Sequence, residues 1–286
     1  MDNDFSRLDD VDRNDIANWV DTAFEATNRV EVRLKDTLKA HFPLVHILLG
    51  MIPNATRRII TEVKSQTARD HCAMFHASRI FCNALGAFLL LQKGMLIEAT
   101  TLVRSVLETT AQAILFMRSQ ECAERWLNGK SYKPAEVRKK LNHRPDIAPL
   151  YDALSGIAHP NPEARWMHSV DMGKAGYAIW YSGAYEPKRA AMLLATFIDI
   201  IVLYLDAFYT CYAGRLSVHA WPLMIEFGRR VNEDLRRWID TLPDDSEAMR
   251  AFLADATPPP PMPPMPIEKA TIDEMIAKMQ NGRKDR

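Results

Sequence analysis

The sequence predicts an all-α fold, a helical bundle around a long helical hairpin with at most one small β-hairpin. Three observations lead to this prediction. Apolar residues recur at helical spacing through most of the 286 residues. No convincing run of alternating β-branched residues occurs in the first 160 positions. One segment, residues 187–213, is apolar on nearly every side, which is typical of the central helix of a bundle.

Composition and charge narrow the class of protein. With 48% hydrophobic and 25% charged residues, the chain can bury a sizeable core. Its 36 basic and 36 acidic residues cancel, so net charge gives no support for nucleic-acid binding, although a local basic patch stays possible. The four cysteines form no C-x-x-C pair, and the N-terminus is acidic, unlike a secretory signal. We therefore expect a cytoplasmic protein whose thiols are small core residues.

The first half of the chain is expected to form three helices. An amphipathic pattern in residues 1–54, the N-terminal helical region, is limited by Pro43. Asn54 is then expected to cap a long helix from Ala55 to Gln92. Gly94 interrupts the pattern before residues 95–120 resume it. Two long helices joined at a glycine predict an antiparallel hairpin.

Shorter elements follow the hairpin. Residues 124–146 are polar and broken by glycine and proline, so we expect a surface connection with a single short helix in it. A helix of about ten residues should end at His159, because Pro160 disfavours the α conformation there. Between residues 161 and 186, alternation at Tyr177, Ile179 and Tyr181 predicts a small β-hairpin.

The apolar segment 187–213 is long enough to raise the question of a membrane span. Asp199 and Asp206 argue against one, because each would cost roughly 2.5 to 3.5 kcal/mol at the centre of a bilayer. We expect no membrane association, and a core bundle domain of residues 55–213 with this segment at its centre.

The C-terminal part is expected to extend the bundle and then leave it. A helical extension spans residues 214–256 and contains one amphipathic helix that should pack on the core. A polyproline linker, residues 257–266, separates it from a short amphipathic tail helix within residues 267–286. Since residues 267–280 keep an apolar face away from the core, we expect them to dock on a protein partner or a second copy.

Several polar residues fall on faces that should be covered. Arg104 and Glu108 share one face of the second long helix with apolar neighbours, and Tyr151, Ser155 and His159 form a stripe on a short helix. Buried polar groups need partners. We therefore predict one polar cluster, either a structural network or a functional site, made of Arg104, Glu108, Tyr151, Ser155, His159 and one or both of Asp199 and Asp206.

The motifs LVRSVLETT and YDALSGIAHP, an Arg-x-x-x-Glu followed by a Tyr-x-x-x-Ser-x-x-x-His-Pro, resemble a bacterial helical family of unknown function. The likeness covers roughly residues 60–212. Such domains are loosely similar to HEPN domains, four-helix units that often dimerise and in many cases cleave RNA without a metal through an Arg-x(4–6)-His motif. That resemblance makes Arg69 and His76, in RDHCAMFH, the catalytic candidates of an RNA-cleaving alternative.

The sequence contains none of the common motifs for other kinds of catalysis or cofactor binding. The sequence has no zinc-ligand spacing, Walker A motif, G-x-G-x-x-G or G-x-S-x-G. We expect no metal and no cofactor. The functional prediction is a bacterial cytoplasmic interaction or regulatory protein, of a defence or toxin–antitoxin setting by family analogy, acting as a homo-oligomer. The alternative is a metal-independent HEPN-like ribonuclease, so whether the chain is an enzyme stays open.

Overall fold

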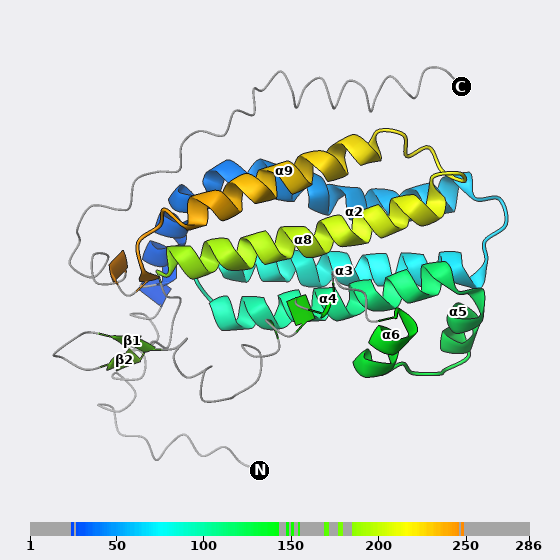
Figure 1. The fold of residues 1–286 in the computed structure, drawn as a ribbon, viewed down its shortest axis with the longest axis horizontal. Coiled ribbons are helices and arrows are strands. Elements are labelled where there is room, and N and C mark those ends of the chain that lie inside the picture. The colour runs from blue at the N-terminus through cyan, green and yellow to red at the C-terminus, as the bar shows by residue number, and fades with distance from the viewer. Residues whose placement is uncertain are drawn as a thin grey trace, which may run out of the picture.

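The computed structural model describes residues 24–25, 27–142, 147–148, 150–151, 154, 169–171, 177–179, 185–245 and 247–248. The predicted all-α class is confirmed (Figure 1). Residues 27–38 are helical and lead through the 3-10 turn η2, Lys39–His41, into the bundle. The helices that the structure describes from end to end after this turn are α2 Phe42–Glu62, α3 Ala68–Gln92, α4 Leu96–Arg118, α5 Gln120–Leu127, α6 Pro134–Lys140, α8 Pro187–Tyr212 and α9 Trp221–Ile239.

The five long helices lie side by side along the length of the molecule, with α8 between α9 and the α3–α4 pair (Figure 1). Helix α8 contributes the most continuous apolar surface, and its buried side chains include Ile198, Ile201, Leu205 and Phe208. The short helices α5 and α6 lie near the C-terminal end of α4. The sequence-based expectation of an apolar helix at the centre of a bundle is therefore confirmed.

The predicted hairpin is formed by α3 and α4, which pack along their whole length. Gly94 lies in the turn with a φ of 69°, a left-handed conformation that residues with a side chain rarely adopt. Its N–H donates to the carbonyl of Leu91, and the N–H of Met95 donates to the carbonyl of Leu90. These bonds satisfy carbonyls that the end of α3 would otherwise leave open.

The expected long helix from Ala55 to Gln92 is wrong, because the chain forms two helices there. Helix α2 already begins at Phe42 and runs through Pro53, whose ring lies on its exposed side. Helix α3 begins after Thr67, whose backbone N–H and hydroxyl both donate to Asp70 Oδ2 at 2.8 and 2.9 Å. This capping box fixes a helix start that apolar periodicity alone does not reveal.

The flanking regions join the same hydrophobic core as the expected core domain. The boundary expected between residues 54 and 55 falls inside α2. Val30 and Leu34 of the first helix are buried in the common core. A Cβ added at Gly228 of α9 would lie 3.1 Å from Val202 and 3.5 Å from Leu48, so α9 packs closely on α8 and α2. The linker 257–266 and tail 267–286 lie outside the described residues.

The expected small β-hairpin region contains two paired strands. Strand β1, Ser169–Asp171, pairs antiparallel with β2, Tyr177–Ile179, and Val170 lies opposite Ala178.

Within the described residues, α3 and α8 are each long and apolar enough to cross a membrane by length and composition. The most apolar window of α8 is 72% buried inside the protein, whereas that of α3 is only 39% buried. Helix α8 thus has the burial of a core helix. Helix α3 keeps a large part of its apolar surface outside the core.

The expectation for the cysteines is right for two of them and wrong for a third. All four thiols are free; Cys72 and Cys122 are buried, and burial raises the pKa of Cys72 to about 11. Cys82, in contrast, is exposed on the outer side of α3. The helical position of residue 82 places it opposite the core-facing side of that helix.

Candidate functional site

Arg104 on α4 is the centre of a polar group that joins three segments. Its Nε donates to Glu108 Oε1 at 3.1 Å, and its Nη2 donates to the hydroxyl of Tyr151 at 3.1 Å. The guanidinium of Arg138, from α6, lies 4.0 Å from the centroid of the Tyr151 ring, and that of Arg104 lies 5.2 Å from it. Tyr151 thus contacts two guanidinium groups, an arrangement in which the ring face attracts positive charge.

The structure therefore brings Arg104, Glu108 and Tyr151 together, and it adds Arg138, which sequence analysis missed. Ser155 and His159 lie outside the described residues. The Arg104–Glu108 pair is mostly but not fully covered, with side-chain exposures of 18% and 29%. A pair at this exposure is compatible with a structural role and with ligand contact.

The expectation that Asp199 or Asp206 joins this group is wrong. Asp199 accepts a hydrogen bond from Asn232 Nδ2 at 2.5 Å and pairs with Arg236, both on α9. Asp206 pairs with Arg229, also on α9, at 3.3 Å. The two aspartates do share one face of α8, but α9 covers that face rather than α4.

Asp199, Asp206 and their partners on α9 line a groove of about 490 Å³ between α8 and α9. Leu150, Val202 and Leu203 supply the apolar part of its lining. Two ion pairs, Asp199–Arg236 and Asp206–Arg229, cross the groove from α8 to α9.

Of Arg69 and His76, the candidates for RNA cleavage, His76 has partners inside the protein. His76 is buried; its Nδ1 donates to the carbonyl of Cys72 at 2.8 Å, and its Nε2 lies 3.3 Å from Gln112 Oε1. Its ring packs against Phe116 and Trp126. Burial lowers the pKa of His76. Both ring nitrogens are engaged inside the protein, which is the environment of a structural histidine.

A buried ionic network closes the end of the bundle where α2, α3 and α8 meet. Asp70 is fully buried and accepts from Arg215 Nη1 and Nη2 at 2.9 and 3.0 Å and from the Tyr212 hydroxyl at 2.9 Å. Burial opposes its ionisation, but the bonds from Arg215 and Thr67 hold the pKa of Asp70 below its usual value. The carboxylate is thus charged and satisfied within the protein.

A second carboxylate in the same region is also satisfied. Glu62 Oε2 accepts the backbone N–H of Ser217 at 2.6 Å, and Oε1 accepts from Arg58 at 2.7 Å. Burial opposes ionisation, yet these contacts lower the pKa of Glu62. This pattern ties the loop after α8 to the end of α2.

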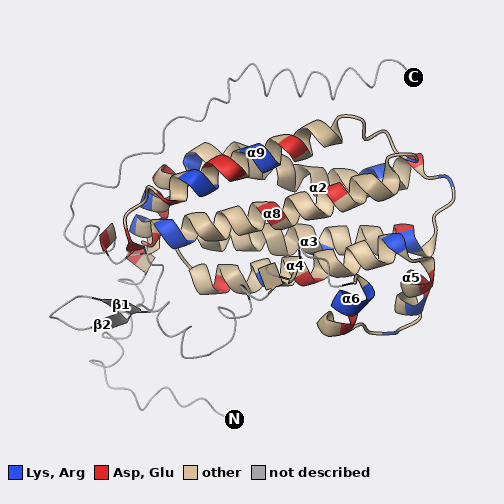
Figure 2. Cartoon of the chain, viewed as in Figure 1, with Lys and Arg blue, Asp and Glu red and all other residues tan. Residues whose placement is uncertain are grey.

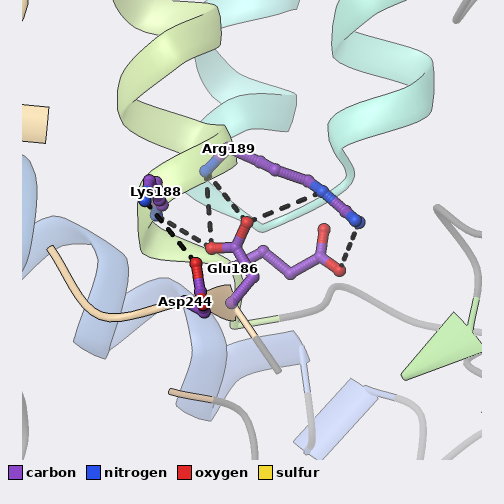
Figure 3. A network of polar contacts seen from close by, with 5 residues as sticks. Glu186, Lys188, Arg189 and Asp244 are labelled. Atoms are coloured by element: carbon purple, nitrogen blue, oxygen red, sulfur yellow. Dashed lines mark hydrogen bonds and ion pairs between the residues drawn. The ribbon is translucent and has the colours of Figure 1, made fainter. Parts of the chain in front are cut away.

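At the other end of the bundle, the pKa of a carboxyl group is raised instead of lowered. Figure 3 shows Glu186, Lys188, Arg189 and Asp244 where α8 begins. Arg189 Nη1 donates to Glu186 Oε1 at 2.8 Å, and Asp245 accepts the backbone N–H groups of Lys188 and Arg189. Burial raises the pKa of Glu186 to about 7; Arg189 opposes that shift and Asp245 adds to it. Glu186 therefore changes charge near neutral pH.

The outer side of α3 carries more large exposed apolar side chains than any other helix in the described part of the chain. Its exposed large apolar side chains are Phe75, Leu85 and Leu89, which keep 60%, 40% and 50% of their surface in water. Sequence analysis missed this surface because it assigned apolar residues to the core. The signal was nevertheless present in the spacing of the exposed positions, His71, Phe75, Ser78, Cys82, Leu85 and Leu89.

Among the described residues, no group of three or more histidine, cysteine, aspartate or glutamate side chains could hold a metal ion. Comparison of the chain with family models, with curated proteins and with solved structures finds no match.

Proposed function

We propose that this chain is a helical interaction protein that acts through self-association, and that the outer side of α3 is the surface it uses. The observation that carries the proposal is that α3 is apolar on both sides. One side, including Ile80, Ala84 and Phe88, belongs to the hydrophobic core. The opposite side leaves Phe75, Leu85 and Leu89 largely in water. Large exposed apolar side chains that gather on one side of a helix indicate an interaction site.

The charge pattern supports an apolar partner. Among the exposed positions of α3, Arg79 alone carries a full charge at neutral pH. The outer side of α9 is different: it alternates acidic and basic side chains, which Figure 2 shows as red and blue turns. Its exposed ion pairs include Glu226–Arg230 and Asp234–Arg237. The outer side of α9 is therefore mostly charged, whereas the outer side of α3 carries three large exposed apolar side chains and a single arginine.

The regulatory role and the defence or toxin–antitoxin setting belong to this proposal on the strength of the sequence resemblance, and the cytoplasmic location belongs to it because the cysteines form no C-x-x-C pair and the N-terminus is acidic. Docking of residues 267–280 on a partner likewise stays a sequence-based prediction. The ribonuclease alternative gains no support from the positions of Arg69 and His76, because His76 is buried and both of its ring nitrogens have partners.

Light scattering over a concentration series tests the proposal. We expect the full chain, 32.6 kDa, to form a dimer or larger assembly whose population rises with concentration. Leu85→Glu and Leu89→Glu should each shift it to monomer, because a charge would be buried unpaired in the interface. The matched control is Leu223→Glu on α9, an equally exposed leucine (56%), which should leave assembly unchanged.

Circular dichroism and melting of the same variants establish that they remain folded. A concentration-independent monomer for the unaltered chain would overturn the proposal. So would an assembly that Leu85→Glu and Leu89→Glu leave intact.

A further inference from the structure

We infer that two copies of this chain pair α3 against α3 in antiparallel orientation, related by a two-fold axis at the level of Ile80. This inference rests on the proposed self-association and specifies its partner, orientation and register. Isologous pairing of one surface with itself is the commonest way in which soluble proteins dimerise.

The exposed residues on α3 have the spacing of a helix that pairs with another helix. Six exposed positions follow one another at intervals of four, three, four, three and four residues, which is the heptad spacing of a coiled-coil seam. A seam with this spacing faces a second helix along its whole length. From residue 71 to residue 89 it is about 27 Å long at 1.5 Å per residue. The six positions are His71, Phe75, Ser78, Cys82, Leu85 and Leu89.

The residues of the seam are arranged symmetrically about its centre. Antiparallel pairing about residue 80 places Phe75 opposite the partner's Leu85 and His71 opposite the partner's Leu89. Small side chains meet at the centre, where Ser78 lies opposite the partner's Cys82. Small central residues let two helices approach closely, and larger apolar residues fill the contact on both sides of the centre. The seam can therefore pack against a second copy of itself that runs in the opposite direction.

A second copy also fits this surface better than a lipid bilayer does. The inner side of α3 is held in the bundle by core packing and by polar contacts with α4: Asn83 Nδ2 donates to Ser105 Oγ at 2.9 Å, and His76 contacts Gln112. Helix α3 therefore offers one side only. A helix that lies on a membrane surface is usually bordered by several basic residues. Here the exposed side includes one arginine.

Disulfide crosslinking of the full chain tests the register. Two proteins of different tag length are used, both with Cys211→Ser to remove the half-buried thiol. One retains Cys82, and the other carries Ser78→Cys with Cys82→Ser. In the inferred dimer, residue 78 faces the partner's residue 82. The two copies of Cys82 are offset by four residues, about 6 Å along the helix. With facing Cα atoms about 5.5 Å apart across the seam, this offset puts the two Cys82 Cα atoms about 8 Å apart, too far for a disulfide.

We expect oxidation of the mixture to give the mixed crosslinked dimer in several-fold excess over either self-crosslinked species, and each protein alone to remain uncrosslinked. Adding Leu89→Glu should abolish the crosslink, and deleting residues 257–286 should leave it unchanged. Self-crosslinking of each protein alone would mean parallel pairing, which overturns this inference but leaves self-association standing.

A dimer by light scattering without any crosslink would mean that another surface is used, which also overturns the inference. A chain that light scattering shows to be monomeric removes the proposed function as well. Loss of the crosslink on deleting residues 257–286 would mean that the tail forms part of the contact, against the pairing of α3 with α3 alone.

Discussion

Arg215 holds Asp70 through two parallel hydrogen bonds, from Nη1 to Oδ1 at 2.9 Å and from Nη2 to Oδ2 at 3.0 Å, although 145 positions separate them in the chain. Asp70 is fully buried at the start of α3, whereas the Arg215 side chain is 35% exposed just after α8. The pair therefore connects the first turn of one helix to the segment that follows another.

We predict that Arg215→Ala lowers the free energy of unfolding by about 2 kcal/mol. The loss is smaller than the 3–5 kcal/mol of a fully buried pair because water reaches the guanidinium. Urea unfolding measures it, and Arg230→Ala, which removes an exposed arginine from α9, is the control with an expected change below about 0.5 kcal/mol. Equal stability of both variants would contradict the assigned role.

The Asp70 carboxylate also contributes to the loss of folding stability at low pH. Because the pKa of Asp70 is lowered in the folded protein, its contribution to stability is present above the unfolded pKa and is lost as pH falls through the folded one. Arg215→Ala should therefore reduce the loss of stability on acidification, measured as the difference from the unaltered chain.

The raised pKa of Glu186 predicts that its contribution to the free energy of unfolding changes with pH in the opposite direction. Its pKa is raised to about 7 from an ordinary value of 4.5, so the folded state retains a proton that the unfolded state loses. The contribution is fully present below pH 4.5 and is lost as pH rises through 7, about 3 kcal/mol in all. Glu186→Gln, which cannot ionise, should match the unaltered chain near pH 4 and exceed its stability by about that amount at pH 8.

Urea unfolding of both proteins at several pH values gives this difference directly, and it cancels the contributions of other titrating groups such as His41, whose pKa burial lowers to about 4. Glu226→Gln, which changes an exposed carboxylate on α9, is the control. A difference between Glu186→Gln and the unaltered chain that stays constant with pH would show that Glu186 is not the titrating group.

His76 yields a prediction that separates the two functional alternatives. Since its ring fills a space beside Phe116 and Trp126, His76→Ala should destabilise the fold by roughly 2 to 3 kcal/mol through lost packing and an unpaired Gln112. Arg69→Ala should change stability little. In an RNA-degradation assay below the melting temperature, neither variant should differ from the unaltered chain. A folded Arg69→Ala or His76→Ala protein that has lost RNA cleavage would instead support the ribonuclease alternative.

Much of the fold could be predicted because its signals are local and strong. Residues 187–213 are apolar on nearly every side, and only the centre of a bundle or a membrane accommodates such a helix. Gly94 marks the α3–α4 turn because that position needs a positive φ. The break between α2 and α3 was missed although residues 64–67 are all polar, because the start of α3 depends on the side chains of only two residues, Thr67 and Asp70.

Less of the polar arrangement could be predicted, because helical spacing shows which residues share a face but not which helix covers it. Asp199 and Asp206 were correctly placed on one face of α8, yet their partners lie on α9. The spacing of Arg229, Asn232 and Arg236 along α9 carried that information, since these residues also share one face. Pairing the two faces requires knowing that α9 packs on α8.

The contact between Arg104 and Tyr151 supports a prediction about whether that group is structural. Tyr151→Phe removes the hydroxyl that accepts from Arg104 Nη2 but keeps the ring beside both guanidinium groups. It should therefore cost about 1 kcal/mol, the usual worth of one such hydrogen bond. Tyr151→Leu should cost roughly 1 kcal/mol more, because the attraction between the ring and the charges of Arg104 and Arg138 is lost as well.

A double-mutant cycle of Arg104→Ala with Tyr151→Phe isolates the hydrogen bond, and we expect a coupling of about 1 kcal/mol in urea unfolding. A structural group shows this coupling and loses assembly and cellular activity only in proportion to stability. If Tyr151→Phe leaves stability unchanged while it abolishes the cellular phenotype, the hydroxyl contacts a ligand or partner, and Arg104 serves to position it. Zero coupling together with unchanged activity would show that the contact contributes to neither.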